Sequence, residues 1–256
     1  MKKIWYQSFV NSDTHPCYIS RLQDKLNEYS LSLNIRFFVF GLNIPDISLH
    51  PLSEFMCSIE VIKNGITAEE KGFDAYVIGH FQEPGLNELK STINIPVIGL
   101  GEASMLYSCQ LGQKIGLITI NPIFVPYHEK QILNYGLEKR IISVKSVNTD
   151  PADYEKAFTD DNILEKILDE FSELIHQMSD DGIEVVIPSG GLPMLLFSSI
   201  KNFKINDTVL VNGIAVVVNT TYSNLNIKDI TGSFISRRGM YKKADDGIID
   251  EFVHNY

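Results

Sequence analysis

Short apolar runs alternate with longer amphipathic stretches along the whole chain. The runs are rich in β-branched and aromatic residues, and several are apolar at every position instead of every second one. Such continuous apolar strands are typical of parallel sheets whose two faces are covered by helices. The pattern predicts strands at residues 4–10, 35–40, 75–79, 96–99, 114–120, 141–147, 184–188 and 209–211.

The clearest helix is predicted at residues 163–178. Apolar residues recur there at three- and four-residue spacing and form one continuous face. Asp160 and Asp161 precede this segment as candidate N-caps, and Gly182 follows it as a stop signal. The alternation of strands with such helices predicts an α/β fold.

The strand pattern also repeats weakly along the chain. Segments 3–9, 72–80 and 97–101 align in the same order with segments 114–120, 182–190 and 209–213, at offsets of 111, 110 and 112 residues. Strands of any doubly wound sheet share some of this composition. We interpret the repeat as two similar α/β halves that face each other across a cleft. The predicted halves are residues 1–107 plus 212–256, and residues 108–211.

Ligands of open α/β sheets bind beyond the carboxyl ends of the strands, so the residues at these ends are the candidate site. They are residues 8–15, 80–83, 99–104, 119–121, 189–191 and 212–213, and the site candidates among them are Ser8, His80, Glu102, Thr119, Asn121, Ser189, Gly190 and Gly191.

His80 directly follows an apolar strand. An imidazole with an ordinary pKa of about 6.5 can accept and return a proton near neutral pH. The alternative is a structural histidine that caps the next helix or pairs with Glu83. We favour the catalytic interpretation because the position faces the predicted cleft.

Ser189, Gly190 and Gly191 form the corresponding strand end of the second half. Two glycines let the backbone approach a ligand, and their amides could bind a carboxylate or an oxyanion, although a tight turn needs the same residues. Ser8, Thr119 and Asn121 suit hydrogen bonding to a carboxylate, amide or imide. Glu102 is expected in a first helical turn, where the helix dipole alone would favour a carboxylate.

Composition narrows the class of partner. Hydrophobic residues make up 44% and charged residues 21% of the 256 residues, and the net charge is −10. The negative charge argues against nucleic acid and anionic membranes as partners. Three scattered cysteines and the absence of a signal-like N-terminus lead us to expect a cytoplasmic protein. No dinucleotide or phosphate-loop motif is present, so no cofactor is expected. The expected partner is a small-molecule substrate.

One stretch carries a family resemblance. Residues 74–86 run from Asp74-Ala75 through His80-Phe81 to Pro84-Gly85-Leu86, and an Ile-Pro-Val-Ile-Gly-Leu-Gly-Glu-Ala turn follows at residues 95–103. This resembles the hydantoin and allantoin racemases of the aspartate/glutamate/hydantoin racemase superfamily. The resemblance implies two pseudo-symmetric Rossmann- or flavodoxin-like lobes with parallel sheets, an inter-lobe active-site cleft, no cofactor and assembly as a homo-oligomer.

The chain departs from this family at the residues that carry its chemistry. Racemases of the family use two cysteines on opposite faces of the substrate carbon. His80 stands at the first of these positions. The second falls on Gly190 or on Ser189, depending on which relatives are aligned. Serine is far too weak an acid to replace a thiol with a reference pKa of about 8.5.

The sequence therefore predicts an isomerase-type, racemase-like enzyme that acts next to a carbonyl of a small acid or cyclic amide. His80 would be the acid or base, and the amides of residues 189–191 with Thr119 and Asn121 would stabilise the enolate-like oxygen. Racemisation would also need Ser189 or a water molecule on the opposite face. The alternatives are a decarboxylase or cyclic-amide hydrolase on the same scaffold, or a non-catalytic protein that binds a small molecule.

Overall fold

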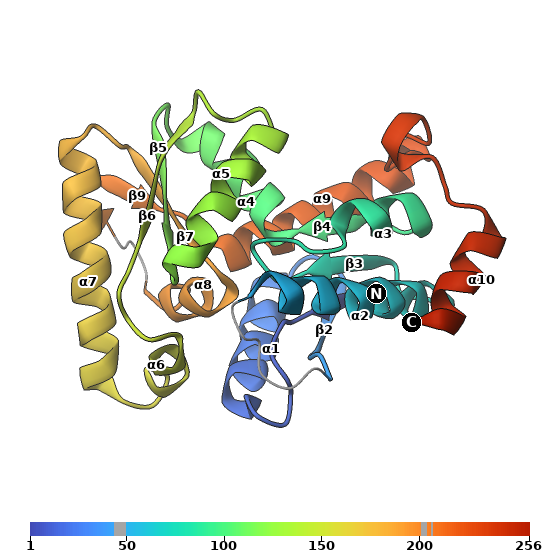
Figure 1. Ribbon diagram of the computed structural model, residues 1–256, viewed down its shortest axis with the longest axis horizontal. Coiled ribbons are helices and arrows are strands. Elements are labelled where there is room, and N and C mark those ends of the chain that lie inside the picture. The colour runs from blue at the N-terminus through green and yellow to red at the C-terminus, as the bar shows by residue number, and fades with distance from the viewer. Residues whose placement is uncertain (44–49, 201–203, 206) are drawn as a thin grey trace.

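Two sheets lie side by side in the computed structural model, which describes residues 1–43, 50–200, 204–205 and 207–256 (Figure 1). The first sheet has the order β2-β1-β3-β4 and the second the order β6-β5-β7-β9-β8. All neighbouring strands are parallel except β8 and β9. The strands are β1 (Lys2–Gln7), β2 (Ile35–Phe40), β3 (Ala75–Ile78), β4 (Val97–Gly99), β5 (Ile115–Thr119), β6 (Ile141–Ser146), β7 (Val185–Ser189), β8 (Lys204–Ile205) and β9 (Thr208–Leu210).

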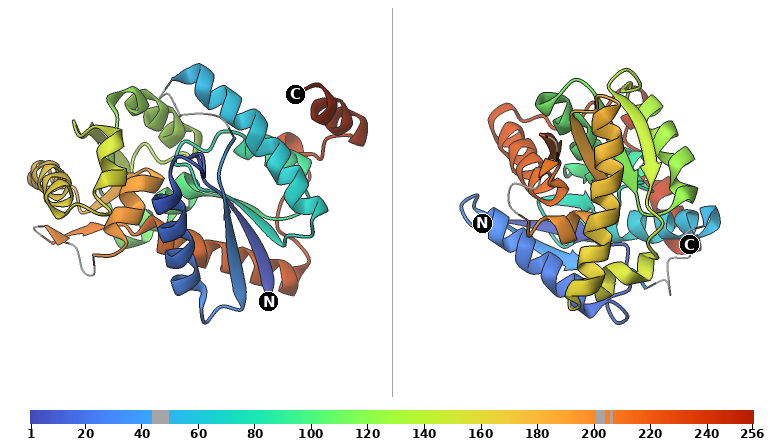
Figure 2. Two further views of the ribbon diagram at one scale, coloured as in Figure 1. Left: turned by 90° about the horizontal axis from the view of Figure 1, so that it is seen from below. Right: turned by 90° about the vertical axis from the view of Figure 1, so that its left-hand side faces the viewer.

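Helices cover both faces of each sheet, as the continuous apolar strands predict. They are α1 (Pro16–Ser30), α2 (Pro51–Glu70), α3 (Leu86–Thr92), α4 (Leu100–Leu111), α5 (Val125–Asn134), α6 (Pro151–Lys156), α7 (Asp161–Asp180), α8 (Gly191–Phe197), α9 (Gly213–Thr231) and α10 (Asp246–Asn255), with short 3-10 turns η1 (Pro122–Phe124) and η2 (Gly239–Tyr241). Helices α1 and α2 lie on opposite sides of the first sheet (Figure 2). The predicted α/β fold class with parallel sheets and two lobes is confirmed.

Alternate residues of each strand pack on opposite faces, because side chains alternate along a β-strand. Ile4 and Tyr6 of β1 belong to the cluster beneath α1, whereas Trp5 packs with α2 and α3 on the other face. The first of these clusters also contains Ile115 and Leu117 of β5, so one continuous core joins the two sheets.

The register of the strands agrees with the internal repeat. Ile4 pairs with Ala75 in the first sheet, and Ile115 pairs with Val185 in the second, which reproduces the offsets of 111 and 110 residues. The third pair of strands departs from the repeat by one residue. Tyr76 pairs with Val97 in the first sheet, whereas its counterpart Val186 in the second sheet pairs with Leu210 and not with Val209. The pseudo-symmetry therefore extends from sequence to strand order.

The predicted caps of the longest amphipathic helix are present. Asp160 accepts hydrogen bonds from the amides of Asn162 and Ile163, at 3.0 and 3.4 Å, and so begins α7. Gly182 follows the end of α7 with φ of +83°, a conformation that favours glycine.

The chain returns to the first sheet after β9. Helix α9 packs against α1, α4, β3 and β4, and the segment that follows is anchored on α3 by Arg237, whose guanidinium donates to the carbonyls of Lys90 and Ile93 at 2.7 and 2.6 Å. The division of the chain into one half of residues 1–107 plus 212–256 and another of residues 108–211 stays a prediction. No helix in the described ranges has the length and apolar content needed to cross a membrane.

We expect Phe171→Ala to lower the free energy of unfolding by about 3–5 kcal/mol, because it opens a cavity in the core beneath α7. Phe171 is fully buried, and its ring packs edge-on against Phe197 at 4.7 Å between centroids. Urea denaturation measures the change. The exposed control Leu133→Ala should stay within about 0.5 kcal/mol of wild type. Equal effects of both substitutions would contradict the assignment of this core.

Candidate active site between the two sheets

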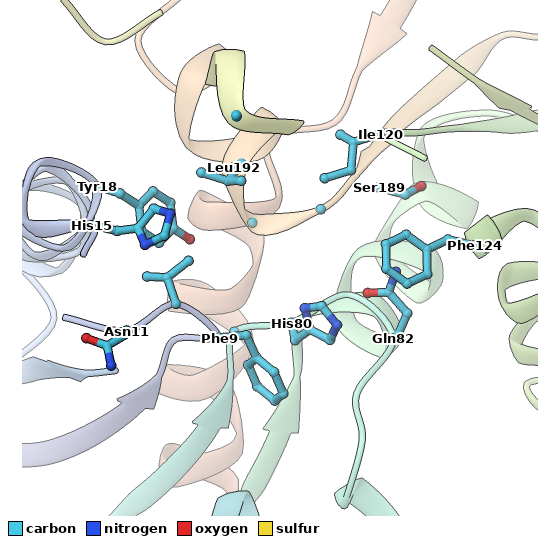
Figure 3. Close-up of a pocket in the computed structure, with 15 residues that line it drawn as sticks. Phe9, Asn11, His15, Tyr18, His80, Gln82, Ile120, Phe124, Ser189 and Leu192 are labelled. Atoms are coloured by element: carbon cyan, nitrogen blue, oxygen red, sulfur yellow. The ribbon is translucent and has the colours of Figure 1, made fainter. Parts of the chain in front are cut away.

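A cavity of about 270 Å³ lies at the carboxyl ends of β1, β3 and β7, where the two sheets face each other (Figure 3). Both halves of the chain contribute to its walls. The lining residues are Phe9, Val10, Asn11, His15, Tyr18, Gly79, His80, Gln82, Ile120, Phe124, Ala152, Ser189, Gly190, Gly191 and Leu192. Of the residues predicted from the sequence, His80, Ser189, Gly190 and Gly191 are among them. Neither lysine nor arginine occurs in this set of described residues.

His80 is held by a carboxylate and an aromatic ring. Its Nε2 lies 3.2 and 3.1 Å from the two carboxylate oxygens of Glu54, in the first turn of α2. The side chains of His80 and Glu54 are only 14% and 7% exposed. Phe9 stacks on the imidazole, with ring centroids 4.3 Å apart and planes at 13°. The ring of His80 is thereby fixed on the cavity wall.

The electrostatics of this pair favour a charged Glu54. Burial raises the pKa of the Glu54 carboxyl, but the charge of His80 and its hydrogen bond outweigh that effect and leave the pKa below its usual value. A carboxylate bound to Nε2 selects the tautomer in which Nε2 carries the proton, so Nδ1 is the basic nitrogen of a neutral His80.

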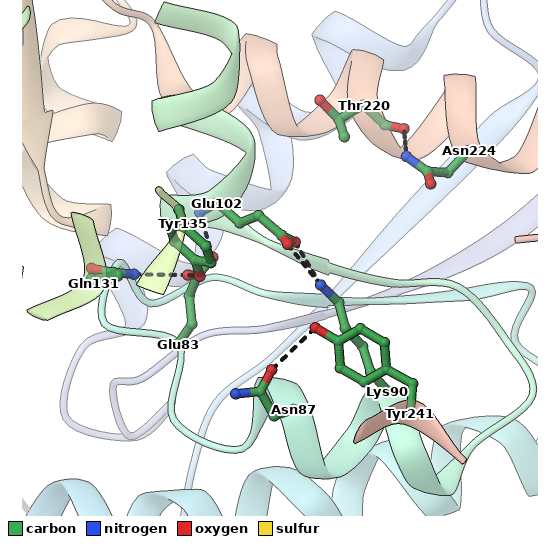
Figure 4. Close-up of polar contacts among 9 residues, drawn as sticks. All are labelled: Glu83, Asn87, Lys90, Glu102, Gln131, Tyr135, Thr220, Asn224 and Tyr241. Carbon is green, nitrogen blue, oxygen red and sulfur yellow. Dashed lines mark hydrogen bonds and ion pairs between the residues drawn. The ribbon is translucent and has the colours of Figure 1, made fainter. Parts of the chain in front are cut away.

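Glu83 does not pair with His80 and instead joins the two halves (Figure 4). Its carboxylate accepts hydrogen bonds from Gln131 Nε2 at 2.8 Å, from the Tyr135 hydroxyl at 2.5 Å and from the amide of Glu102 at 2.7 Å. Burial raises the pKa of Glu83 to about 7, although these hydrogen bonds oppose the shift. Its backbone φ of +55° is unusual for a residue with a side chain. The loop that carries His80 is therefore held against α5.

Thr119 and His128 form a second buried contact behind the cavity. His128 Nε2 lies 3.2 Å from the Thr119 hydroxyl, and both side chains are fully buried. Burial lowers the pKa of His128 to about 4, so this imidazole is neutral at physiological pH. Thr119 is not among the residues that line the cavity, and its hydroxyl is engaged with this histidine.

The turn of residues 189–191 lies opposite His80, on the second half. Gly190 donates its amide to the carbonyl of Pro188 at 3.0 Å, so this N–H is not free for a ligand. Ser189 Oγ lies 3.4 Å from the Ile187 carbonyl, a long contact. A Cβ atom on Gly191 would come within 2.7 Å of the Tyr18 hydroxyl, which explains why glycine stands there.

The remaining predicted site residues lie outside the cavity. Ser8 is fully buried beside Tyr18. Asn121 begins η1 by accepting a hydrogen bond from the Ile123 amide at 2.9 Å. Glu102 points toward α3, where its carboxylate pairs with Lys90 Nζ at 2.7 Å (Figure 4). The side chains of Asn121 and Glu102 thus have structural partners away from the cavity.

Sequence reasoning missed the residues that reach the cavity from helices or flank it. Glu54 is separated from His80 by 26 residues and comes from α2, while Tyr18 comes from the first turn of α1. The three cysteines, Cys17, Cys57 and Cys109, are free and do not line the cavity. Within the described ranges, no cluster of three His, Cys, Asp or Glu side chains could hold a metal ion.

Comparison with known proteins points to one family. The family model described as Asp/Glu/Hydantoin racemase matches residues 18–220. The hydantoin racemase of Pseudomonas sp. (strain NS671) is 31% identical over 98 residues, or 38% of each chain. The hydantoin racemase of Rhizobium meliloti is 29% identical over 119 residues, or 46% of this chain and 47% of the relative. The chain thus matches less than half the length of these relatives.

Solved structures share the fold over nearly the full length. The allantoin racemase from Klebsiella pneumoniae superposes with a TM-score of 0.75 at 16% identity, covering 96% of this chain and 94% of the other. The allantoin racemase from Pseudomonas fluorescens gives a TM-score of 0.70 at 19% identity, covering 95% and 97%. At these identities the comparison shows a common fold.

The buried carboxyl of Glu83 gives stability a pH dependence that can be measured. Its pKa is about 7 in the folded chain and near 4.5 in its ordinary state, so folding favours the protonated form. Stability should therefore fall as the pH rises from about 4.5 to about 7. Glu83→Gln stays neutral, and we expect its stability relative to wild type to rise by up to about 1.4 kcal/mol per pH unit in this window.

Urea denaturation of both proteins between pH 4.5 and 8 measures this difference. The exposed control Glu129→Gln should follow the wild-type pH dependence. A constant difference between Glu83→Gln and wild type across the window would contradict the assigned pKa.

Proposed function

The chain belongs to the Asp/Glu/hydantoin racemase family, and from this premise we propose that it moves a proton at the carbon next to a carbonyl of a small, neutral cyclic amide. The observation that carries this proposal is the His80–Glu54 pair on the wall of the cavity between the two sheets. One base is sufficient to accept the proton in the first step of this chemistry.

The tautomer of His80 supports its role as the base. With the Nε2 proton directed at Glu54, the Nδ1 lone pair accepts the proton from the substrate carbon, and the electron pair of the broken C–H bond moves to the carbonyl oxygen. The resulting imidazolium is stabilised by the Glu54 carboxylate. Return of this proton from His80 restores the original substrate. Inversion requires that Ser189 or a water molecule delivers a proton to the opposite face, while the proton on His80 is released to solvent.

The charges around the cavity favour a neutral substrate. Lysine and arginine side chains bind a substrate carboxylate most strongly, and the described residues that line the cavity include neither. The nearby Glu54 carboxylate would also repel an anion. Hydantoin-type rings are neutral near pH 7. Among the substrates in the names of the relatives, these considerations favour hydantoins over aspartate or glutamate.

The shape of the cavity favours an apolar substituent on that ring. Phe9, Ile120, Phe124 and Leu192 supply apolar walls from both halves of the chain. A volume of about 270 Å³ suits a five-membered ring with a side chain of aromatic or branched aliphatic type. The same lack of cations makes a malonate-type decarboxylation less suited to this site.

The chemistry differs from that of two thiols, because Cys17, Cys57 and Cys109 do not reach the cavity. Burial raises the pKa of Cys57 to about 12, which suits a structural thiol within α2. We therefore assign proton removal to an imidazole and not to a thiolate.

The proposal is tested by proton exchange in deuterated water. Substrates of four classes are compared: 5-benzyl- and 5-isopropylhydantoin, allantoin, free amino acids and arylmalonates. We expect deuterium to enter the ring carbon of the apolar hydantoins faster than in enzyme-free controls, as followed by NMR. The proposal fails if no ligand that raises the melting temperature exchanges its proton.

Substitution of the proposed base gives the second test. We expect His80→Gln to lower the exchange rate by about 10²–10⁴-fold, the usual contribution of a general base. Glu54→Gln should lower kcat by about 10–100-fold, as loss of an orienting partner usually does. The exposed His254→Gln serves as the matched control and should exchange at the wild-type rate. Wild-type activity in His80→Gln would contradict the assignment.

A further inference from the structure

Tyr18 places a phenol in the wall of the cavity. The residue lies in the first turn of α1, its side chain is 2% exposed, and its hydroxyl points into the space between the sheets (Figure 3). It comes from the half that carries His80 but reaches the other half, because its oxygen lies 2.7 Å from the place a Cβ of Gly191 would occupy. The phenol thus occupies the space that the glycine leaves open.

The first turn of α1, which carries Tyr18, is held in place by contacts between the two halves. The amide of Tyr18 donates to the Glu155 carboxylate on α6 at 3.2 Å. One helical turn later, Arg21 donates to the carbonyl of Phe158 at 2.7 Å and lies over its ring. Both partners belong to the segment that covers the second sheet. The first turn of α1 is therefore fixed across the cavity.

Three groups that the sequence suggested for stabilising a developing negative charge are engaged elsewhere. The Thr119 hydroxyl contacts His128, the Asn121 side chain begins η1, and the Gly190 amide donates to Pro188. An enolate formed by proton removal needs a hydrogen-bond donor near its oxygen, since a buried unpaired charge is costly. The Tyr18 hydroxyl is a donor on the cavity wall, which the side chains of Asn11, His15 and Gln82 also line.

We propose that Tyr18 is a catalytic residue that donates a hydrogen bond to the enolate oxygen formed when His80 removes the proton. This inference rests on the proposed function. The electron pair of the C–H bond moves to the carbonyl oxygen, which accepts the hydrogen bond from the phenol, while the proton resides on His80 Nδ1. No proton leaves Tyr18, and reprotonation of carbon returns the carbonyl.

The surroundings of Tyr18 suit a donor and not a base. Burial raises the pKa of the phenol well above its usual value, and the charge of Glu155 acts in the same direction, although the Ser8 hydroxyl opposes the shift. The phenol stays protonated in the pH range in which a histidine base operates. A neutral phenol in a dry pocket gains strength as a donor when negative charge develops on its acceptor.

The first test compares turnover in Tyr18→Phe and wild type. The substitution keeps the ring and removes only the hydroxyl, and we expect kcat for exchange to fall by about 10²–10³-fold with little change in KM. The matched control is Tyr29→Phe on the same helix. The Tyr29 hydroxyl joins the two halves by donating to the Ser198 carbonyl at 2.9 Å, outside the cavity, so its loss should lower the melting temperature and leave kcat unchanged.

The second test measures binding and needs no turnover. Barbituric acid is a planar ring that exists as an enolate at neutral pH, so it mimics the anion that Tyr18 would stabilise. We expect Tyr18→Phe to weaken barbiturate binding by at least tenfold in calorimetry and to change the affinity for 5,5-dimethylhydantoin, a neutral ring, by less than threefold. Tyr29→Phe should bind both rings as wild type does.

The outcomes separate this inference from the proposed function. If wild type exchanges hydantoin protons and Tyr18→Phe does so at the same kcat with unchanged barbiturate affinity, the role of Tyr18 is wrong and the function stands. If Tyr18→Phe weakens the binding of barbiturate and of 5,5-dimethylhydantoin equally, Tyr18 only shapes the pocket and the inference is overturned. If wild type exchanges no substrate, the proposed function fails, and selective loss of barbiturate binding would still identify Tyr18 as an anion-stabilising donor.

Discussion

The buried carboxylate of Glu83 fixes the position of the site, because it ties the loop that carries His80 to the other half of the chain. A carboxylate that is 5% exposed is costly to bury unless donors surround it. Tyr135, Gln131 and the Glu102 amide supply these donors, and Gln131 also donates to the Phe81 carbonyl at 2.7 Å. The side chain of Gln131 thus holds both Phe81 and Glu83, the residues on either side of Gln82.

The opposite side of the cavity is closed by a separate set of contacts. Glu155 and Phe158 hold the first turns of α1 through the Tyr18 amide and the Arg21 guanidinium. Since contacts between the halves lie on two sides of the cavity, His80 and Tyr18 have defined positions before any substrate binds. Such preorganisation is the main means by which a site without strong nucleophiles can lower a barrier.

The features that follow from periodicity could be predicted from the sequence. Apolar runs identified β1 to β7 and β9 but not the short β8, Asp160 and Gly182 bounded α7, and the internal repeat anticipated the matching strand order of the two sheets. The placement of His80 and of residues 189–191 on the cavity also follows, because parallel strands direct their carboxyl ends to one edge. These predictions depend on local pattern and topology alone.

The partners of those residues could not be predicted in the same way. Glu54 meets His80 only because α2 packs across the end of β3, and no spacing in the sequence records that contact. Glu83 was the nearer carboxylate in sequence, yet its side chain turns toward α5. Thr119, Asn121 and Glu102 have the expected chemistry at strand ends, but each is engaged with a neighbour away from the cavity. Side-chain direction, and not position along the strand, decides which residues line the site.

On the proposed mechanism, His80 and Tyr18 face one neutral ring between the two sheets. The most direct measurement is a crystal structure with a 5,5-disubstituted hydantoin, which fits the same space and has no proton to lose. We expect the substituted ring carbon to face Nδ1 of His80, a ring carbonyl oxygen to lie within hydrogen-bonding distance of the Tyr18 hydroxyl, and His80 to remain bound to Glu54. A ring bound outside this cavity, or one whose substituted carbon faces away from His80, would contradict the claim.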